Sequence, residues 1–274
     1  MSYAQALHTR NKVVAVIGAS SGIGRAVALK SARAGDELVL VARRQHLLDE
    51  LASRITDETR GRSDVSANRD APILVAGDIR LEETASQLVE QALLTYNRLD
   101  VVVYAAGWNV PQRGIGEATL RSWQQIVDTN MTGAFLVTSA VVPLMRRQGD
   151  GLLIFISSSG AKRPDRSGAA YQASKAGLAA LAHATMEESR EDGVRTTVIY
   201  PGLTDTAFLE HRPTPTDPET LRNALQADDV AQAVRFVIEL PERAHVPELL
   251  LYPARTNERP SLSRGQKTLT EAST

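Results

Sequence analysis

The sequence predicts a single α/β domain built on a doubly wound parallel sheet of about seven strands. Short apolar runs rich in Val, Ile and Leu alternate with longer amphipathic stretches along most of the chain. Continuous apolar runs are typical of strands covered on both faces, and regular alternation of strand and helix favours right-handed parallel crossovers. The 274 residues fit one large domain, and no Pro/Gly-rich linker divides them.

The apolar runs predict strands in the order KVVAVI, ELVLV, PILVA, LDVVVY, GLLIFI, RTTVI and ELLL. They occupy residues 12–17, 37–41, 72–76, 99–104, 151–156, 195–199 and 248–251. Between them apolar side chains recur at helical spacing, as at Leu48, Leu51 and Ile55. We therefore expect helices at 22–34, 45–55, 81–96, 169–191 and 228–240, and a helical region that ends at residue 147.

Three segments lie outside this alternation. Residues 56–71 are polar and charged, which predicts a surface loop. Residues 203–220 contain three prolines beside a strand end, and we interpret them as a mobile lid. Residues 256–274 are polar and predict a peripheral tail that follows a domain of residues 1–255.

The composition excludes several classes of protein. Hydrophobic residues are 43% and charged residues 23%, so the chain is not disordered along its whole length. A net charge of −1 argues against a nucleic-acid partner and an anionic membrane surface. The chain has no cysteine, and its five histidines show no ligand spacing, so we expect no metal site. With no apolar signal segment and no 18-residue apolar run, we expect a cytoplasmic protein.

A glycine cluster joins the first expected strand to the first expected helix. Gly18, Gly22 and Gly24 lie in the segment IGASSGIG. Such glycines permit a tight turn and a close approach of the backbone to a pyrophosphate, which the N–H groups of the helix start then bind. A tight turn without a ligand has the same spacing, but the position at the first strand–helix turn favours nucleotide binding.

A tyrosine and a lysine share one face of a later helix. Tyr171 and Lys175 belong to YQASK, and Ser158 precedes the tyrosine by 13 residues at a strand end. An ammonium near a phenol lowers the pKa of the phenol, which suits Tyr171 to acid–base catalysis. The Ser158 hydroxyl is placed to donate to a carbonyl oxygen. A tyrosine and a lysine at this spacing are common on ordinary helices. Here the serine at the preceding strand end and the glycine cluster earlier in the chain favour an active site.

Together these motifs resemble the short-chain dehydrogenase/reductase family, over about residues 12–254. The resemblance implies a Rossmann fold and a catalytic set of Asn130, Ser158, Tyr171 and Lys175. It implies that the Asn130 backbone carbonyl holds a water in a proton relay through Lys175. The family interval of 13 selects Ser158 over its neighbours Ser157 and Ser159. A homodimer or homotetramer is also implied.

The resemblance also implies a cofactor site. Asp78 would accept from the adenine amino group, and the segment after Pro201 would meet the nicotinamide. The family's Asn-Asn-Ala-Gly is here Tyr104-Ala105-Ala106-Gly107, which removes both asparagine side chains from that turn. The expected cofactor-binding residues are Gly18, Ser20, Ser21, Gly22, Ile23, Gly24, Arg43, Arg44, Asp78, Ile79, Ala106, Gly107, Tyr171, Lys175, Pro201, Gly202, Thr204 and Thr206.

The end of the second strand predicts the cofactor. NAD enzymes of this fold place an acid there to bind the ribose 2′-hydroxyl. Here Ala42 occupies that position and Arg43 and Arg44 follow it. Arginine binds a 2′-phosphate that an acid would repel, so we expect NADP.

The resulting prediction is an NADP(H)-dependent oxidoreductase acting on a small carbonyl or secondary alcohol. An epimerase or dehydratase of the same fold and a non-catalytic NADP-binding regulator are the alternatives. Candidate substrate contacts are Trp108, Asn109 and the segments 160–166 and 203–222. Within these, Arg163 and Arg166 are candidates for attracting a carboxylated substrate.

Overall fold

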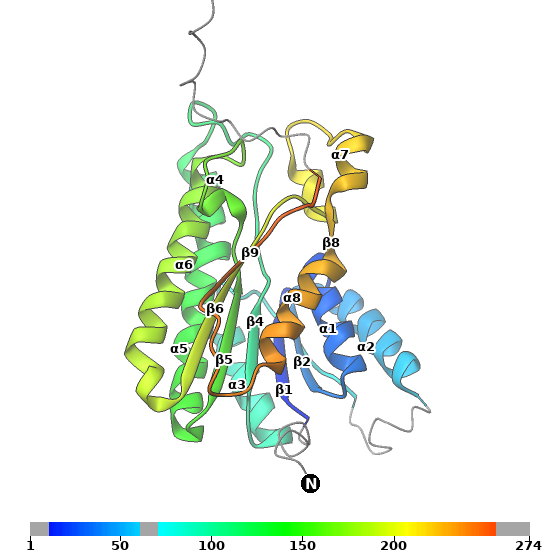
Figure 1. Cartoon of the computed structure of the whole chain (residues 1–274), viewed down its shortest axis with the longest axis vertical. Coiled ribbons are helices and arrows are strands. Elements are labelled where there is room, and N and C mark those ends of the chain that lie inside the picture. The colour runs from blue at the N-terminus through cyan, green and yellow to red at the C-terminus, as the bar shows by residue number, and fades with distance from the viewer. Residues whose placement is uncertain (1–10, 61–70, 256–274) are drawn as a thin grey trace, which may run out of the picture.

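The computed structural model describes residues 11–60 and 71–255, which form a seven-stranded sheet covered by helices on both faces (Figure 1). Every neighbouring pair of strands in this sheet is parallel, and their order is β3-β2-β1-β4-β5-β6-β9. The predicted doubly wound α/β fold is confirmed. The strands are β1 (Val13–Ile17), β2 (Glu37–Ala42), β3 (Ile73–Ala76), β4 (Val101–Tyr104), β5 (Gly151–Ile156), β6 (Val194–Pro201) and β9 (Glu248–Leu251).

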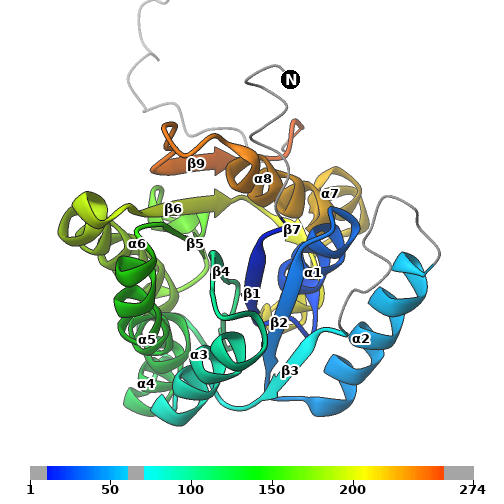
Figure 2. The same ribbon diagram turned by 90° about the horizontal axis from the view of Figure 1, so that it is seen from below.

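Two helical layers bury the two faces of the sheet, and Figure 2 separates them. One layer contains α1 (Gly22–Arg33), α2 (Gln45–Thr59) and α8 (Ala227–Glu239). The other contains α3 (Glu82–Tyr96), α5 (Gly133–Gln148) and α6 (Ala169–Ser189). The central strand β1 is covered on both sides and buried along its whole length, as its unbroken apolar run predicts. Within the described residues, no helix is both long and apolar enough to cross a bilayer.

The predicted helical region that ends near residue 147 is interrupted. It consists of α4 (Leu120–Val127), a π-helical turn (Asp128–Thr132) and α5. In the π turn the Gly133 N–H donates to the Asp128 carbonyl, five residues back instead of four. This turn lies beside the carboxyl end of β4, where the Tyr104 hydroxyl donates to the Thr129 carbonyl at 2.6 Å.

Two predicted loops differ from the structure. The expected loop at 56–71 begins too early, because α2 continues to Thr59. The Glu58 carboxylate on this last turn binds Arg54 of α2 and Arg33 of α1, which holds the turn in place. The remainder of that loop, residues 61–70, and the tail at 256–274 lie outside the described residues. The expected lid contains β7 (Thr204–Asp205) and the start of α7 (Pro218–Asn223), and β7 pairs with β8 (Leu225–Gln226).

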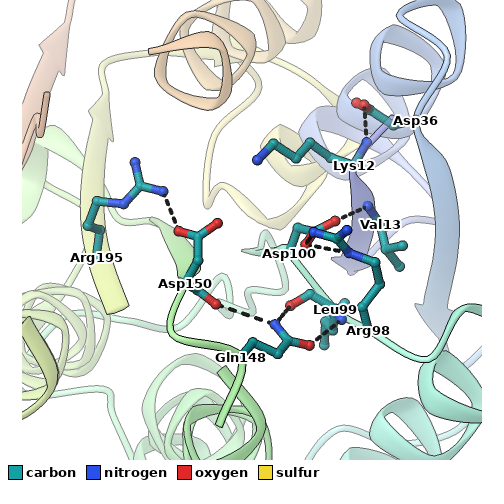
Figure 3. A network of polar contacts seen from close by, with 9 residues as sticks. All are labelled: Lys12, Val13, Asp36, Arg98, Leu99, Asp100, Gln148, Asp150 and Arg195. Carbon is teal, nitrogen blue, oxygen red and sulfur yellow. Dashed lines mark hydrogen bonds and ion pairs between the residues drawn. The ribbon is translucent and has the colours of Figure 1, made fainter. Parts of the chain in front are cut away.

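A polar network closes the amino-terminal edge of the sheet (Figure 3). The buried Asp100 carboxylate accepts from the Val13 N–H at 2.7 Å and from the Arg98 guanidinium. The Gln148 amide bonds both the N–H and the carbonyl of Leu99, at 3.0 and 2.9 Å. Farther along, Asp150 pairs with Arg195 of β6 at 2.9 Å. This edge therefore joins β1, β4, β5 and β6, and it lies opposite the carboxyl ends of the strands.

Candidate active site

A cavity of about 560 Å³ opens at the carboxyl ends of the strands, where β1 and β4 separate the two halves of the sheet. In open α/β sheets this is the usual place for a ligand. Most of the predicted site residues line this one cavity, although they come from segments far apart in the sequence. They are Gly18, Ser20, Ser21, Gly22, Ile23, Arg43, Arg44, Asp78, Ile79, Ala106, Gly107, Ser158, Tyr171, Lys175, Pro201, Gly202, Thr204 and Thr206.

Two predicted residues, Gly24 and Asn130, lie behind the cavity wall instead of lining it. A Cβ on Gly24 would collide with the Gly18 carbonyl oxygen, so this glycine permits close packing of the turn on α1. Gly18 has a φ of +85°, and a Cβ there would lie 2.8 Å from the Ala106 nitrogen. Both glycines therefore shape the cradle, and the predicted reasons for glycine at these positions agree with the geometry.

The start of α1 fits an anion. Ser21 is the N-cap residue, but its side chain accepts no hydrogen bond from the first helical turn. The Arg44 guanidinium lies above this start and donates to Ser20 Oγ at 3.1 Å and Ser21 Oγ at 3.3 Å. A helix N-terminus with uncapped N–H groups and an adjacent arginine suits the phosphates of a dinucleotide.

Asp78 has a partner that the sequence analysis missed. The Arg80 guanidinium donates to both carboxylate oxygens of Asp78, with two of the distances at 3.0 Å. The hydrogen bond from Arg80 lowers the pKa of Asp78 most, and the Arg43 charge adds to this effect. Arg43 therefore lies near Asp78 at the expected adenosine end of the cavity. The spacing Asp-x-Arg could have indicated this ion pair, because the long arginine side chain can reach a carboxylate two residues earlier in the chain.

Tyr171 lies at the other end of the cavity, near the first turn of α6. Only 9% of this side chain is exposed, and its burial raises the pKa of the phenol to about 12. A hydrogen bond with the Ser158 hydroxyl and the charge of Arg113 act in the opposite direction. The structure thus differs from the expected lowering by Lys175, because desolvation outweighs the lowering interactions.

Lys175 is buried one helical turn after Tyr171. Its ammonium lies 5.9 Å from the centre of the Tyr171 ring and donates to the Ile156 carbonyl at 2.8 Å. Burial lowers the pKa of Lys175 to about 8. A Cβ on Gly107 would lie 3.5 Å from the same nitrogen, so the Gly107 backbone packs beside the lysine at the cavity.

Asn130 occupies the middle of the π turn and is completely buried. Its side-chain amide accepts from the Trp108 N–H at 2.7 Å and donates to the Trp108 carbonyl at 3.1 Å. It also donates to Ser174 Oγ at 2.9 Å, and Ser174 in turn donates to the Tyr171 carbonyl at 2.8 Å. Asn130 therefore ties the loop after β4 to the helix that carries the tyrosine and lysine.

The three consecutive serines after β5 have different surroundings. Ser157 is buried, and its hydroxyl donates to the Lys175 carbonyl at 2.9 Å, so it connects β5 to α6. Ser158 faces the cavity and contacts Tyr171. Its hydroxyl also accepts from the Gly160 N–H at 3.2 Å. The geometry agrees with the choice of Ser158.

The substrate end of the cavity has aromatic walls. The Trp108 and His211 rings lie 4.3 Å apart, and Phe208 lies 5.8 Å from both the Tyr171 and the His211 rings. Trp108 was expected here, and so was the segment 203–222 that contains Phe208 and His211, although the sequence did not predict the internal structure of that segment. The exposed side chains of Arg163 and Arg166 are not among the residues that line the cavity, so their predicted role in attracting substrate is not supported.

Comparisons with known proteins agree with this geometry. Residues 12–216 match the family described as short chain dehydrogenase. An uncharacterized oxidoreductase of Listeria monocytogenes is 32% identical over 254 residues, which cover 89% of this chain and 97% of that protein. The chain therefore belongs to the short-chain dehydrogenase family, and it is an oxidoreductase by this membership.

Two solved structures show the same fold with a bound nucleotide. One is an alcohol dehydrogenase from the archaeon Thermococcus sibiricus, complexed with 5-hydroxy-NADP. It is 27% identical with a TM-score of 0.79, covering 92% of this chain and 99% of that one. The other is a short chain dehydrogenase from Shigella flexneri, complexed with NADP. It is 28% identical with a TM-score of 0.77, covering 89% and 98% of the two chains.

Proposed function

We propose that this protein is an NADP(H)-dependent oxidoreductase that transfers a hydride between nicotinamide and a small carbonyl or secondary alcohol. The observation that carries the proposal is one cavity with two chemically distinct ends. At one end lie the uncapped start of α1 and the arginines Arg43 and Arg44. At the other end lie Ser158, Tyr171 and Lys175. When bound, the reduced dinucleotide supplies the hydride.

The side chains of this protein have separate roles in the reducing direction. Ser158 donates a hydrogen bond to the substrate carbonyl oxygen and so stabilises its developing negative charge. Tyr171, which keeps its proton at neutral pH, gives that proton to the oxygen. Lys175 binds the nicotinamide ribose and supplies positive charge. Asn130 fixes the loop and helix that hold these groups, and its backbone carbonyl positions the relay water.

Replacing the Tyr171 hydroxyl tests the catalytic proposal. We expect Tyr171→Phe to bind NADPH as wild type does but to lose turnover on a panel of ketones, aldehydes and diketones, because only the proton donor is removed. Loss of NADPH absorbance measures turnover, and Tyr252→Phe, an exposed tyrosine outside the cavity, is the matched control. Near-normal turnover by Tyr171→Phe would contradict the assignment. Binding of NADPH without turnover by wild type on the whole panel would favour the regulator.

The preference for NADP is the second part of the proposal. Two similar structures contain NADP or NADH, so the fold alone does not select the nucleotide. The selection rests on Ala42 in place of an acid and on Arg43 and Arg44 beside the phosphate loop. An arginine bonds a 2′-phosphate with a geometry that a ribose hydroxyl cannot match.

Removing one arginine tests this preference. Arg43→Ala is expected to lower kcat/KM for NADPH by about 10- to 100-fold and to change that for NADH little, since hydrogen bonds to charged groups contribute about 1.5–3 kcal/mol. Arg44→Ala should also lower kcat/KM for NADPH, because it removes the guanidinium that donates to Ser20 and Ser21. Arg121→Ala, an exposed residue on α4, is the control. A wild type that prefers NADH, or an unchanged NADPH/NADH ratio in Arg43→Ala, would refute the proposal.

The proposed quaternary state is a homodimer or homotetramer. From the family resemblance we expect α5 and α6 to lie at such contacts. Phe135 of α5 is 55% exposed, and an exposed phenylalanine on this helix supports the proposal. The oligomeric state stays a prediction.

A further inference from the structure

Two arginines that no sequence motif contains reach the substrate end of the cavity. Arg113 comes from the loop between β4 and α4, and Arg212 from the segment that follows Phe208. The charge of Arg113 acts on the Tyr171 phenol, and the charge of Arg212 acts on Arg113. Arg113, Arg212 and Tyr171 all line the same cavity.

Arg113 is held in position and incompletely paired. A Cβ on Gly168 would lie 2.6 Å from the Arg113 carbonyl oxygen and 2.8 Å from its Cβ, so the loop packs tightly on the residue before α6. Asn109 reinforces this docking by donating to the Ser167 carbonyl at 2.9 Å. Nevertheless, within the part of the chain that the structure describes, the buried Arg113 Nε has no hydrogen-bond partner. A buried guanidinium N–H without a partner is costly, so the hydrogen bonds of Arg113 inside the protein are incomplete.

The charges around Arg113 also favour an anion. Burial lowers the pKa of Arg113 most, and repulsion by Arg212 lowers it further. The acids among the lining residues here are Asp165 and Glu210, both exposed. Asp165 already accepts from the Ser167 N–H at 2.8 Å, and the Arg212 guanidinium donates to Thr216 Oγ1 at 3.2 Å. At Arg113, burial and the charge of Arg212 outweigh the favourable charge of Asp165, so a further negative charge in the cavity would be stabilised there.

We propose that Arg113 and Arg212 bind a carboxylate group of the substrate, so that the natural substrate is a small keto acid or hydroxy acid. This inference deepens the proposed function and rests on it. A guanidinium fork matches the two oxygens of a carboxylate, and the aromatic walls formed by Trp108, Phe208 and His211 enclose a short carbon chain between the carboxylate and the reacting carbon.

Binding without turnover tests the inference separately from the proposed reaction. The complex with NADPH cannot oxidise an alcohol, so its affinity for hydroxy compounds is measured by isothermal titration calorimetry. The probes are lactate and 3-hydroxybutyrate, their methyl esters, and glycerol 3-phosphate. We expect wild type to bind at least one of the two acids about 10- to 100-fold more tightly than its ester, since each hydrogen bond to a charged group is worth about that much.

Two substitutions locate the effect. Arg113→Gln and Arg212→Gln should each remove most of the preference for the acid and leave ester binding nearly unchanged. Arg163→Gln, whose exposed side chain lies outside the cavity, should keep the wild-type preference. Thermal melting of each variant, and ester binding by it, show that the protein is folded.

The outcomes separate the two proposals. Equal wild-type affinities for acids and esters, tighter binding of glycerol 3-phosphate than of either acid, or loss of the preference in Arg163→Gln alone would overturn the carboxylate site. Arginine-dependent binding of acids by a protein that never oxidises NADPH would retain the site and overturn the proposed reaction. Efficient reduction of neutral ketones with no preference for acids would retain the proposed reaction and overturn the carboxylate site.

Discussion

Tyr171 and Lys175 titrate in opposite directions from their ordinary values, and one cause explains both. Burial disfavours the charged form of each group, so the pKa of the phenol rises to about 12 and that of the ammonium falls to about 8. The tyrosine is therefore protonated throughout the neutral range, as an acid for carbonyl reduction must be. The lysine is the group of the pair that loses its proton first as the pH rises.

This order of titration predicts the pH dependence of reduction. We expect kcat/KM for the carbonyl to be level below about pH 8 and to fall above it, because Lys175 loses its positive charge while Tyr171 still keeps its proton. Lys175→Arg keeps a charge at this position, so the fall in its residual activity should move to higher pH. Initial rates with saturating NADPH at constant ionic strength measure both profiles. A fall near pH 8 that persists unchanged in Lys175→Arg would show that another group titrates.

At the residue scale, sequence patterns identified only those functional side chains that belong to motifs. Ser158, Tyr171 and the glycines were found because fixed intervals relate them to one another. Arg113 was missed, and Arg212 was included only as part of the candidate segment 203–222, because spacing in an irregular segment does not show which way a side chain points. The pKa of Tyr171 was also misjudged, since burial is a property of the folded site and a sequence interval reports only proximity.

At the scale of elements, the turn after β4 is stabilised in an unexpected way. The two asparagines expected by resemblance are absent, and the buried Tyr104 hydroxyl instead reaches the Thr129 carbonyl in the π turn. A π turn leaves carbonyls without their regular helical partners, so an outside donor is favourable there. Sequence periodicity could not predict this turn, because the interaction joins residues 25 positions apart. The two-residue strands β7 and β8 were missed because they are too short to show a period.

The segment 203–220 gives a prediction at the same scale. Its residues from Leu203 to Arg212, except Asp205, line the cavity, where His211 contacts Trp108 and Phe208 contacts Tyr171. We expect amide hydrogen exchange in this segment to be fast in the free protein and slower with NADP and substrate together, because ligands would fill the space beneath it. Exchange followed by mass spectrometry compares the free and bound protein, with α8 as the internal control. Equal protection in both states would contradict the lid interpretation.

At the scale of the whole molecule, stability and chemistry lie at opposite edges of the sheet. The network of Asp100, Arg98, Gln148 and Asp150 joins the amino ends of the strands (Figure 3). Every proposed catalytic group lies at the carboxyl ends. The sequence predicted the fold class but not the order of the strands, since apolar runs do not show which strands pair. The network itself has no motif, because it is assembled from isolated polar residues at strand ends.

This separation predicts a variant that changes stability alone. Asp100→Ala should lower the free energy of unfolding by about 1.5–3 kcal/mol, since it removes the charged acceptor of the Val13 N–H and the partner of Arg98. Asp57→Ala, an exposed acid on α2, should change it by less than about 0.5 kcal/mol. Denaturant unfolding gives both values, and kcat/KM at 25 °C should remain at the wild-type level. A large loss of kcat/KM in folded Asp100→Ala would contradict the separation.

The π turn also restricts how the length of this chain can vary during evolution. A π turn holds one residue more than an α turn, so deleting one residue from 128–132 would restore a regular helix and take Asn130 away from Trp108. An insertion or deletion within the α-helical part of α5 would instead turn the rest of that helix by about 100°, and the core-facing side chains Val137, Val141 and Met145 would leave the sheet. Insertions and deletions are therefore expected to accumulate in the loops on either side of residues 120–148 and to be selected against within them.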